Sequence, residues 1–230
     1  MKNFFIFLLI VFSFVQCKNY ESQMLPSGSH AGYNYVDLGL SVKWATYNVG
    51  ATKPLEYGDY FAWGEVATKE YYDWSTYRYI DYSDTLLIKY CNYSTYGKDS
   101  LVDSILILKL EDDVASMKWN GHWRIPTREE WEELRNNCTW EWIVLDEVNG
   151  YLVTSNVLGY TNRSIFLPAT GFMWEDSSPY LGSLGCYWSS SLDTIQPYFA
   201  INLLFNSDDV NWGDYEFSRD FGHSVRAVFY

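Results

Sequence analysis

Histidine, the side chain that most often serves in catalysis and metal binding, occurs only three times among the 230 residues. The three stand far apart, and none has the paired spacing of a zinc-binding helix: His30, His122 and His223. No Gly-x-Ser-x-Gly nucleophile elbow occurs, since residues 182–185 are one residue short of that motif. The sequence therefore predicts a protein that is not an enzyme and holds no metal.

Basic residues are also scarce. The chain has 16 Lys and Arg against 29 Asp and Glu, a formal net charge of −13. Such a balance repels the phosphate backbone of nucleic acids and the headgroups of anionic lipids. We therefore expect no nucleic-acid partner, and no membrane contact other than through a lipid anchor.

Cysteines are few and widely spaced. Cys17 lies near the N-terminus, and an odd number remains further along, at Cys91, Cys138 and Cys186. This spacing is not a metal-binding pattern and defines no disulfide framework. One pair could bridge in an oxidising compartment, and the sequence does not choose it. Buried free thiols are the favoured interpretation.

The one long apolar run, residues 4–15, is shorter than the roughly 20 residues needed to span a bilayer. It is typical of a secretory signal peptide, which we place at residues 1–16. The following Cys17 completes a segment that resembles a bacterial lipobox, although Gln16 stands where a small residue is usual. Cys17 is thus the predicted lipid-attachment residue of a cell-envelope, outer-membrane lipoprotein. Ordinary signal cleavage near the same place is the alternative.

The remaining chain reads as a tether followed by one domain. Residues 17–32 are polar and include Pro26, Gly28 and Ser29, which predicts a flexible tether. From residue 33 onward no Pro-, Gly- or Ser-rich break divides the sequence. A hydrophobic fraction of 48% is sufficient for one sizeable core. We therefore expect a single domain over residues 33–230.

Short runs of β-branched and aromatic residues bounded by turn formers predict strands in most of this domain. Residues 66–100, rich in Tyr, Ser, Thr and Asp, predict a long surface excursion, and 171–185 a loop. The sequence does not decide the secondary structure of the apolar run at 101–110. The predicted strands before the last part of the chain are residues 35–38, 42–49, 59–63, 139–144, 151–154 and 164–167.

Two helices interrupt these strands. Asp112 or Asp113 can cap a short helix that runs to about Lys118. The second helix starts with a capping box, in which Thr127 and Glu130 satisfy each other's backbone amides. Trp131 and Leu134 then share one face of that helix. Two helices within a strand-rich chain predict an α+β fold.

The C-terminal part contains three apolar-aromatic runs, residues 186–191, 198–205 and 222–230. Acidic and Asn-rich turns separate them. This pattern predicts a meander of short antiparallel strands. The connections combine polar, acidic and aromatic residues, which favours a recognition surface over a catalytic site.

Several blocks resemble one known family. They are YVDLGLSVKWAT at 35–46, NVGA at 48–51, YGDYFAWGE at 57–65, LEDDVAS at 110–116, WRIPTREEW at 123–131, YWSSS at 187–191 and GHSVR at 222–226. In this order they resemble the Fibrobacter succinogenes major paralogous domain, which is common in lipoproteins of the Bacteroidetes. The resemblance covers most of residues 35–230. It departs from the family at Ala227, where proline is common.

The resemblance implies a C-type-lectin-like fold with paired N- and C-terminal strands, two helices, and binding through the late loops. It implies no catalytic residue. Related formylglycine-generating enzymes use a cysteine pair near the C-terminus, and only Cys186 lies in that region here. That activity is therefore not expected.

Aromatic residues are unusually frequent, at 20% of the chain with 11 Trp, 21 Tyr and 13 Phe. Most tryptophans fall within the family blocks and are expected to fill the core. Trp212 and Tyr215 lie between acidic turn residues and are the better candidates for an exposed surface. We predict a glycan or surface-protein partner, bound by the 192–196 and 206–220 loops. The candidate ligand-binding residues are Asp193, Asn206, Asp208, Asp209, Asn211, Trp212, Asp214 and Tyr215.

Three alternatives accompany this hypothesis. The oxygen-rich segment 206–211 could coordinate Ca²⁺, which takes six to eight oxygen ligands, but the calcium-lectin signatures are missing and a solvated acidic turn is favoured. Glu65 and Glu130 could form a hydrolase carboxylate pair, although structural roles are favoured for both. A structural or adhesive module without a discrete site is the remaining alternative.

Overall fold

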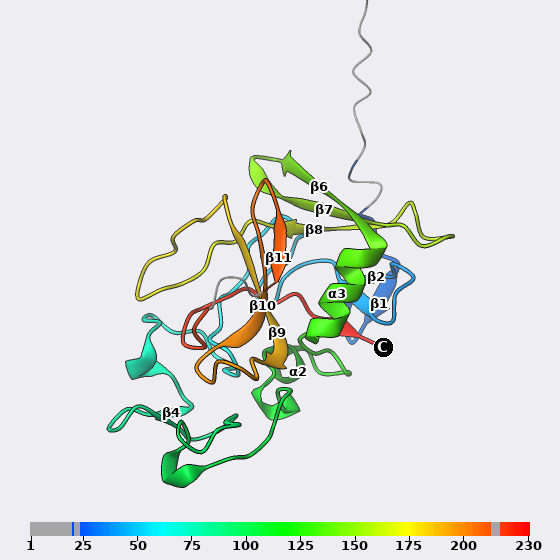
Figure 1. The fold of residues 1–230 in the computed structure, drawn as a ribbon. Coiled ribbons are helices and arrows are strands. Elements are labelled where there is room, and N and C mark those ends of the chain that lie inside the picture. Colours follow the sequence, from blue (N-terminus) through cyan, green and yellow to red (C-terminus); the bar gives the residue numbers. More distant parts are fainter. Residues whose placement is uncertain (1–19, 21–23, 213–216) are drawn as a thin grey trace, which may run out of the picture.

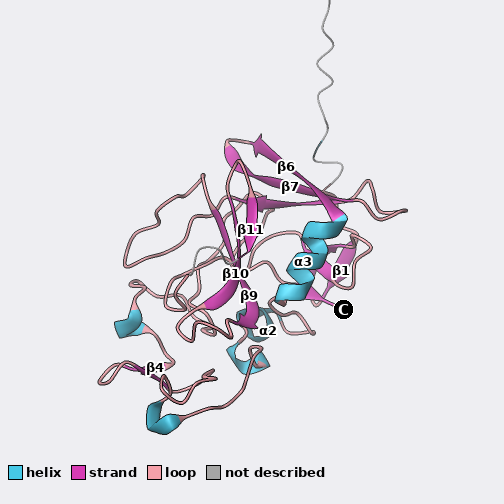
Figure 2. Cartoon of the chain, viewed as in Figure 1, coloured by secondary structure: helices cyan, strands magenta, loops and turns pink. Residues whose placement is uncertain are grey.

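The computed structural model describes residues 20, 24–212 and 217–230, a mixed α+β structure of small antiparallel sheets with two α-helices in this part of the chain (Figures 1 and 2). The α+β prediction is thus confirmed at the level of fold class. The expected signal peptide and Cys17 lie outside the described residues. None of the described helices combines the length and apolarity that crossing a bilayer requires.

The two ends of the described chain meet in one sheet. Its strands lie in the order β1 (Gly28–His30), β2 (Tyr33–Val36), β3 (Lys43–Ala45) and β12 (Val228–Phe229). The last strand is antiparallel to β3, with Val228 opposite Trp44. The C-terminal strand therefore joins the N-terminal sheet, but it pairs with the third strand, whereas the resemblance implied pairing with the first.

The ordered chain begins earlier than the sequence predicted. Residues 28–30 were assigned to the flexible tether, but they form β1 and pair with β2. Ala31 and Gly32 connect the strands with φ angles of 48° and 88°, a two-residue turn that suits the twist of a hairpin. The ring of His30 stacks on Phe229 at 4.3 Å, and its carbonyl accepts a 3.0 Å hydrogen bond from the indole of Trp123. These long-range contacts hold the segment in place.

A second sheet consists of β6 (Cys138–Leu145), β7 (Val148–Ser155) and β8 (Ser164–Pro168), in that order. All three predicted strands are present, and each is longer than the sequence indicated. β6 and β7 pair over their full length and are joined by Asp146 and Glu147. In Figure 1 this sheet forms the upper layer of the molecule.

The C-terminal meander is partly as predicted. β9 (Gly185–Leu192), β10 (Ala200–Phe205) and β11 (Val210–Trp212) form an antiparallel sheet in the order β11-β10-β9. The third predicted strand, 222–230, does not belong to it. Its start makes a parallel bridge from Ser224 to Tyr187, and its end forms β12 in the first sheet. The short β11 takes the place beside β10 because a tight turn over 206–209 brings it there.

Both predicted helices are confirmed, together with their caps. α2 (Val114–Trp119) has Asp113 as its N-cap, and α3 (Arg128–Asn137) starts with the complete Thr127–Glu130 capping box. Trp131 and Leu134 of α3 are both fully buried. Capping satisfies amides that lack partners within a helix, so these signals are readable within a few residues.

Most of the segment 66–100 lies at the surface, as predicted, but parts of it fold into the core. It contains a small hairpin of β4 (Ile80–Asp81) and β5 (Leu86–Leu87) and the 3₁₀ turns Trp74–Thr76 and Lys98–Ser100. Four of its tyrosines are nevertheless buried: Tyr72, Tyr77, Tyr79 and Tyr90. The hydroxyls of Tyr79 and Tyr90 both donate to Asp112, in the 3₁₀ turn Leu110–Asp112, so the segment folds inward to satisfy a buried carboxylate.

The interior is aromatic, as the family blocks indicated. Five tryptophans are almost completely inaccessible to solvent: Trp44, Trp63, Trp123, Trp131 and Trp188. The three described cysteines are buried free thiols, which confirms that prediction. Arg226 is also fully buried and donates to the carbonyls of Ala45 and Phe166 at 3.1 and 2.8 Å and to Asn48 Oδ1 at 2.9 Å. It ties the N-terminal sheet to β8.

Candidate functional site

The fold separates the residues that the sequence analysis grouped as one site. Asp193 lies in the connection after β9, whereas Asn206, Asp208 and Asp209 lie in the turn after β10. These two connections are at opposite ends of β10, which has six residues. At about 3.3 Å per residue the two ends are roughly 20 Å apart. Asp193 therefore does not share a site with the other three.

Several of these oxygens serve the turns themselves. Asp193 Oδ1 accepts hydrogen bonds from the amides of Ile195 and Gln196 at 2.8 and 3.0 Å. Asn206 Oδ1 accepts in the same way from Asp208 and Asp209 at 2.8 and 3.0 Å. Asn and Asp stabilise turns by this local bonding. Across the described residues, no group of three or more His, Cys, Asp or Glu side chains could hold a metal ion.

The remaining predicted residues fall in or beside the part of the chain that is not described. Asn211 and Trp212 are strand residues of β11, where they pair with Leu204 and Leu203 of β10. Asp214 and Tyr215 lie outside the described residues. The predicted exposure of Trp212 and Tyr215 therefore stays a prediction.

The 206–209 turn borders an aromatic pocket of about 390 Å³. Its lining comes from the end of β10, from the loop before β9 and from Phe217. The lining residues are Phe172, Tyr180, Leu184, Leu204, Phe205, Asn206, Asp209 and Phe217. A pocket lined mainly by apolar and aromatic groups, with a few polar ones, is the usual form of a small-ligand site.

Phe172 organises the rings of this pocket. Phe221 lies nearly parallel to it at 5.6 Å between ring centroids, Tyr180 stacks at 5.9 Å, and Phe217 meets it at 4.9 Å and 62°. Trp174 extends the row beyond Phe221, at 6.3 Å. Tyr180 is 63% exposed and Trp174 50% exposed. The row thus runs from a buried ring to two rings that solvent can reach.

The loop carrying these rings is held at several points. Met173 pairs with Gly222, and Glu175 pairs with Tyr72. Gly171 has a φ of 59°, and a Cβ there would lie 2.6 Å from the carbonyl oxygen of Pro179, so the loop returns closely on itself. Backbone pairing on both sides fixes the rings before any ligand binds, which lowers the entropic cost of binding.

His223 lies behind the aromatic wall. Its ring stacks on Trp188 at 3.9 Å and contacts Phe217 at 4.9 Å and Phe172 at 6.2 Å. It is fully buried, and neither ring nitrogen has a hydrogen-bond partner within the described chain. Burial lowers the pKa of His223 to about 3, because a charged imidazolium would be desolvated there. The ring is therefore neutral and supports the wall as an aromatic group.

Polar groups stand on one rim of the pocket. Asp209 is exposed, and one of its carboxylate oxygens accepts from the amide of Val210 at 2.7 Å. No Lys or Arg is among the lining residues. Burial raises the pKa of Tyr151, and the carboxylates of Asp209 and Asp208 add to that rise, so the field around the rim is negative. The arrangement suits a ligand with an apolar face and hydrogen-bond donors, and it disfavours an anion.

The sequence analysis found one side of this pocket and missed the other. Asn206 and Asp209 were named, whereas Phe172, Tyr180 and Phe217 were not. Residues 171–185 were treated only as a loop, although they hold Phe172, Trp174 and Tyr180 among Gly, Ser and Pro. Aromatic residues in an otherwise polar loop were the available signal.

A second cavity, of about 480 Å³, lies at the opposite end of β10 beside Asp193, Thr194 and Ile195. Its other lining residues are mostly aliphatic, and no aromatic ring is among them. Charged groups such as Arg128 and Glu129 line it, but it has no ring on which the apolar face of a ligand could stack. The 192–196 loop is therefore the weaker part of the predicted binding surface.

The two carboxylates considered as a hydrolase pair are engaged elsewhere. Glu65 accepts from the amide of Arg78 at 2.7 Å and pairs with Lys69 at 2.9 Å. Glu130 completes the helix cap and pairs with Arg124. Both residues therefore have the structural roles that the sequence favoured.

Comparison with known proteins finds no relative of this chain. No family model, no curated protein and no solved structure matches the chain. Inference about function accordingly starts from the aromatic pocket and its loops.

Proposed function

We propose that the protein is a non-catalytic binding module that takes a glycan in the aromatic pocket. The observation that carries the proposal is the pocket in which the accessible Tyr180 stands with the polar rim at Asn206 and Asp209. The row of rings continues from this pocket through Phe221 to the accessible Trp174. The apolar face of a sugar ring stacks on such aromatic groups, while its hydroxyls donate to rim oxygens. The negative rim favours neutral or amino sugars over acidic ones.

The finer fold proposal is a C-type-lectin-like domain of the Fibrobacter major paralogous type. Three features support it: the terminal strands joined in one sheet, the two helices, and a late sheet whose loops border the pocket. The ordered sequence blocks support it independently. A calcium ion is not part of the proposal, because Asn206 Oδ1 is already used inside the turn.

The proposed location is the outer membrane of the cell envelope, with attachment through acyl chains on Cys17. The apolar run at 4–15 and the lipobox-like segment before Cys17 support this. The partner is a glycan or glycosylated surface protein. A net charge of −13 supports the exclusion of nucleic acid.

A glycan array followed by calorimetry on the best ligand tests the proposal. We expect Tyr180→Ala with Trp174→Ala to weaken binding by at least about 10-fold, since each loses a stacking surface worth roughly 1 kcal/mol. Both side chains are largely exposed, so thermal unfolding should change little. Tyr82→Ala is the matched control, because Tyr82 is 66% exposed in the turn between β4 and β5.

Two outcomes count against the proposal. Undiminished binding by the double variant places the glycan site elsewhere on the chain. Absence of any ligand on the array favours a structural or adhesive module without a discrete site.

A further inference from the structure

β6 is the outer strand of its sheet, and it is the least protected of the three. Every residue of β8 is buried and most of β7 is buried, whereas Cys138 alone is buried in β6. Val144 is 60% exposed. Figure 1 shows β6 along the upper margin of the molecule, with β7 and β8 beneath it. Exposure thus rises steadily toward one edge of the sheet.

Among the described residues, no strand lies beside the outer edge of β6. In a strand, alternate residues direct their N–H and C=O groups to opposite sides, so half of those in β6 point away from β7. Outside the β6–β7 ladder, no backbone hydrogen bond joins residues 138–145 to another described residue. An edge of this kind is a template for one more strand.

Two of the usual devices that protect an edge, proline and a bulge, are missing from β6. Its sequence, CTWEWIVL, contains no proline and no lysine. Its register with β7 runs without a shift from Cys138 to Leu145, so no bulge twists the edge away. Aromatic and β-branched residues fill most of the strand, and these favour extended pairing. The edge is therefore straight and can pair its backbone with a strand of complementary charge.

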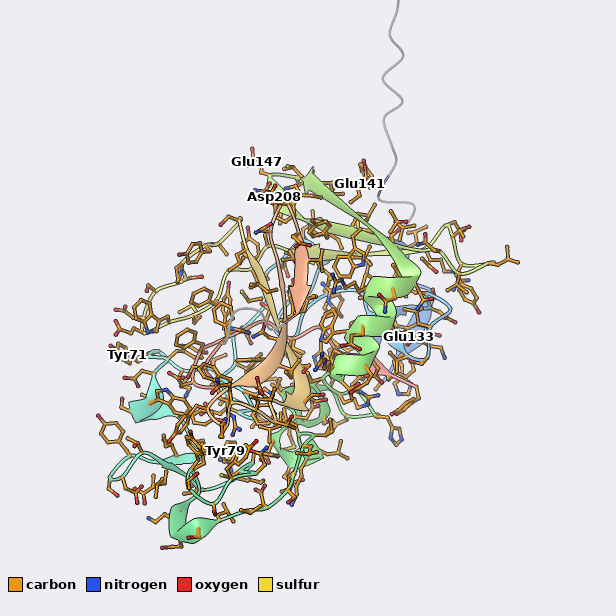
Figure 3. The ribbon with its side chains drawn as sticks, in the orientation of Figure 1. Tyr71, Tyr79, Glu133, Glu141, Glu147 and Asp208 are labelled. Atoms are coloured by element: carbon orange, nitrogen blue, oxygen red, sulfur yellow. The ribbon has the colours of Figure 1, made fainter. Side chains whose placement is uncertain are left out.

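Acidic charge surrounds this edge. No Lys or Arg occurs between Arg135 and Arg163. Asp146 and Glu147 form the exposed turn at the end of β6, and Asp208 extends from the neighbouring β10–β11 turn. In Figure 3 Glu147 and Asp208 lie together along the upper margin of the molecule. A strand added here runs through a negative field.

We propose that the β6 edge binds an extended, basic segment of a partner protein as a fourth strand of the β6–β8 sheet. Backbone hydrogen bonds along β6 supply affinity, and the carboxylates around it select Lys and Arg. A second copy of this chain is disfavoured as the occupant. It would bring another charge of −13 and the same carboxylates to the edge. This surface is separate from the aromatic pocket, and the proposal does not depend on glycan binding.

The test uses two synthetic peptides as long as β6, one alternating Lys with Val and the other alternating Glu with Val. We expect fluorescence anisotropy to show saturable binding of the Lys peptide, at least about 10-fold tighter than the Glu peptide. Hydrogen–deuterium exchange should show new protection in residues 138–145 on binding. Equal affinity for both peptides, or protection confined to other segments, overturns the proposal.

Two kinds of variant locate the site. Consecutive residues direct their amides to opposite sides, so one of Ile143→Pro and Val144→Pro should leave β7 pairing intact while it abolishes peptide binding. The double variant Asp146→Lys, Glu147→Lys should weaken binding of the Lys peptide without changing the pairing of β6 with β7. Glu70→Lys, at an exposed position far along the chain, is the charge control.

Two results contradict the proposal outright. If the reversal at 146 and 147 weakens binding no more than Glu70→Lys does, the carboxylates at the edge do not select the peptide. If the protein dimerises in sedimentation with protection of 138–145 and binds neither peptide, the occupant is a second copy.

Discussion

Replacing His223 by Phe should remove a large part of the protein's sensitivity to acid. His223 is fully buried without a partner for either nitrogen in the described chain, and burial lowers its pKa to about 3 from an ordinary value of 6.5. Between these two pH values the unfolded state binds a proton that the folded state refuses. The stability associated with His223 is therefore present above pH 6.5 and is lost as the pH falls.

The magnitude follows from the size of the shift. Each pH unit below 6.5 lowers the free energy of unfolding by about 1.4 kcal/mol, so at pH 5 it is lower by about 2 kcal/mol. Asp113 acts in the opposite direction, because burial raises the pKa of its carboxyl to about 6 and its folded state gains a proton as the pH falls. Comparing wild type with His223→Phe at each pH cancels the effect of Asp113 and isolates that of the histidine.

Urea denaturation at pH 7.5 and pH 5 measures the difference. Between these pH values we expect the free energy of unfolding to fall by about 2 kcal/mol more in the wild type than in the variant. At pH 7.5 the variant should be at least as stable, since Phe keeps the ring on Trp188 and removes two desolvated nitrogens. His122→Asn, at an exposed position with positive φ, is the control and should keep the wild-type pH dependence. Equal pH dependence in His223→Phe and wild type would refute the assignment of a buried neutral ring.

Three further changes test the fold by chemical denaturation. Thr127→Ala breaks the capping box of α3 and should cost about 1 kcal/mol, while Thr127→Ser should retain most of it. Glu147→Gly should stabilise by about 0.5–1 kcal/mol, because Glu147 has a φ of 66° in a two-residue turn that glycine adopts freely; a loss of stability there would contradict the turn geometry. Arg226→Lys should cost about 3 kcal/mol or more, since a single ammonium cannot reach Asn48 and two separate carbonyls, and near-wild-type stability would show that those bonds contribute little.

Features that depend on neighbouring residues were readable in the sequence. Asp113 and Thr127 cap their helices as predicted, because an N-cap bonds to amides only two or three positions away. The strands around 139–167 were also located correctly, with ends extended by a few residues. The free thiols followed from the spacing of the cysteines, and the buried tryptophans from the family blocks that contain them.

Features that depend on distant residues could not be predicted from the sequence. Four tyrosines of the predicted surface segment 66–100 are buried, because Asp112 and the core supply partners for them from elsewhere in the chain. The third C-terminal run leaves the meander, because β3 offers it an edge at the other end of the chain. The predicted tether extends too far, to residue 32, because contacts with Trp123 and Phe229 hold β1 in the fold.

The sequence by itself determined the α+β class, the two capped helices and the aromatic interior of this protein, since each rests on composition or on bonds within a few residues. Only the tertiary structure decided where the binding surfaces lie. The direction of β10 separates Asp193 from Asn206, and the folded chain brings Phe172, Tyr180 and Phe217 to the same pocket. The free edge of β6 likewise exists because the sheet ends there. Such sites depend on which distant segments meet, and local patterns do not encode those meetings.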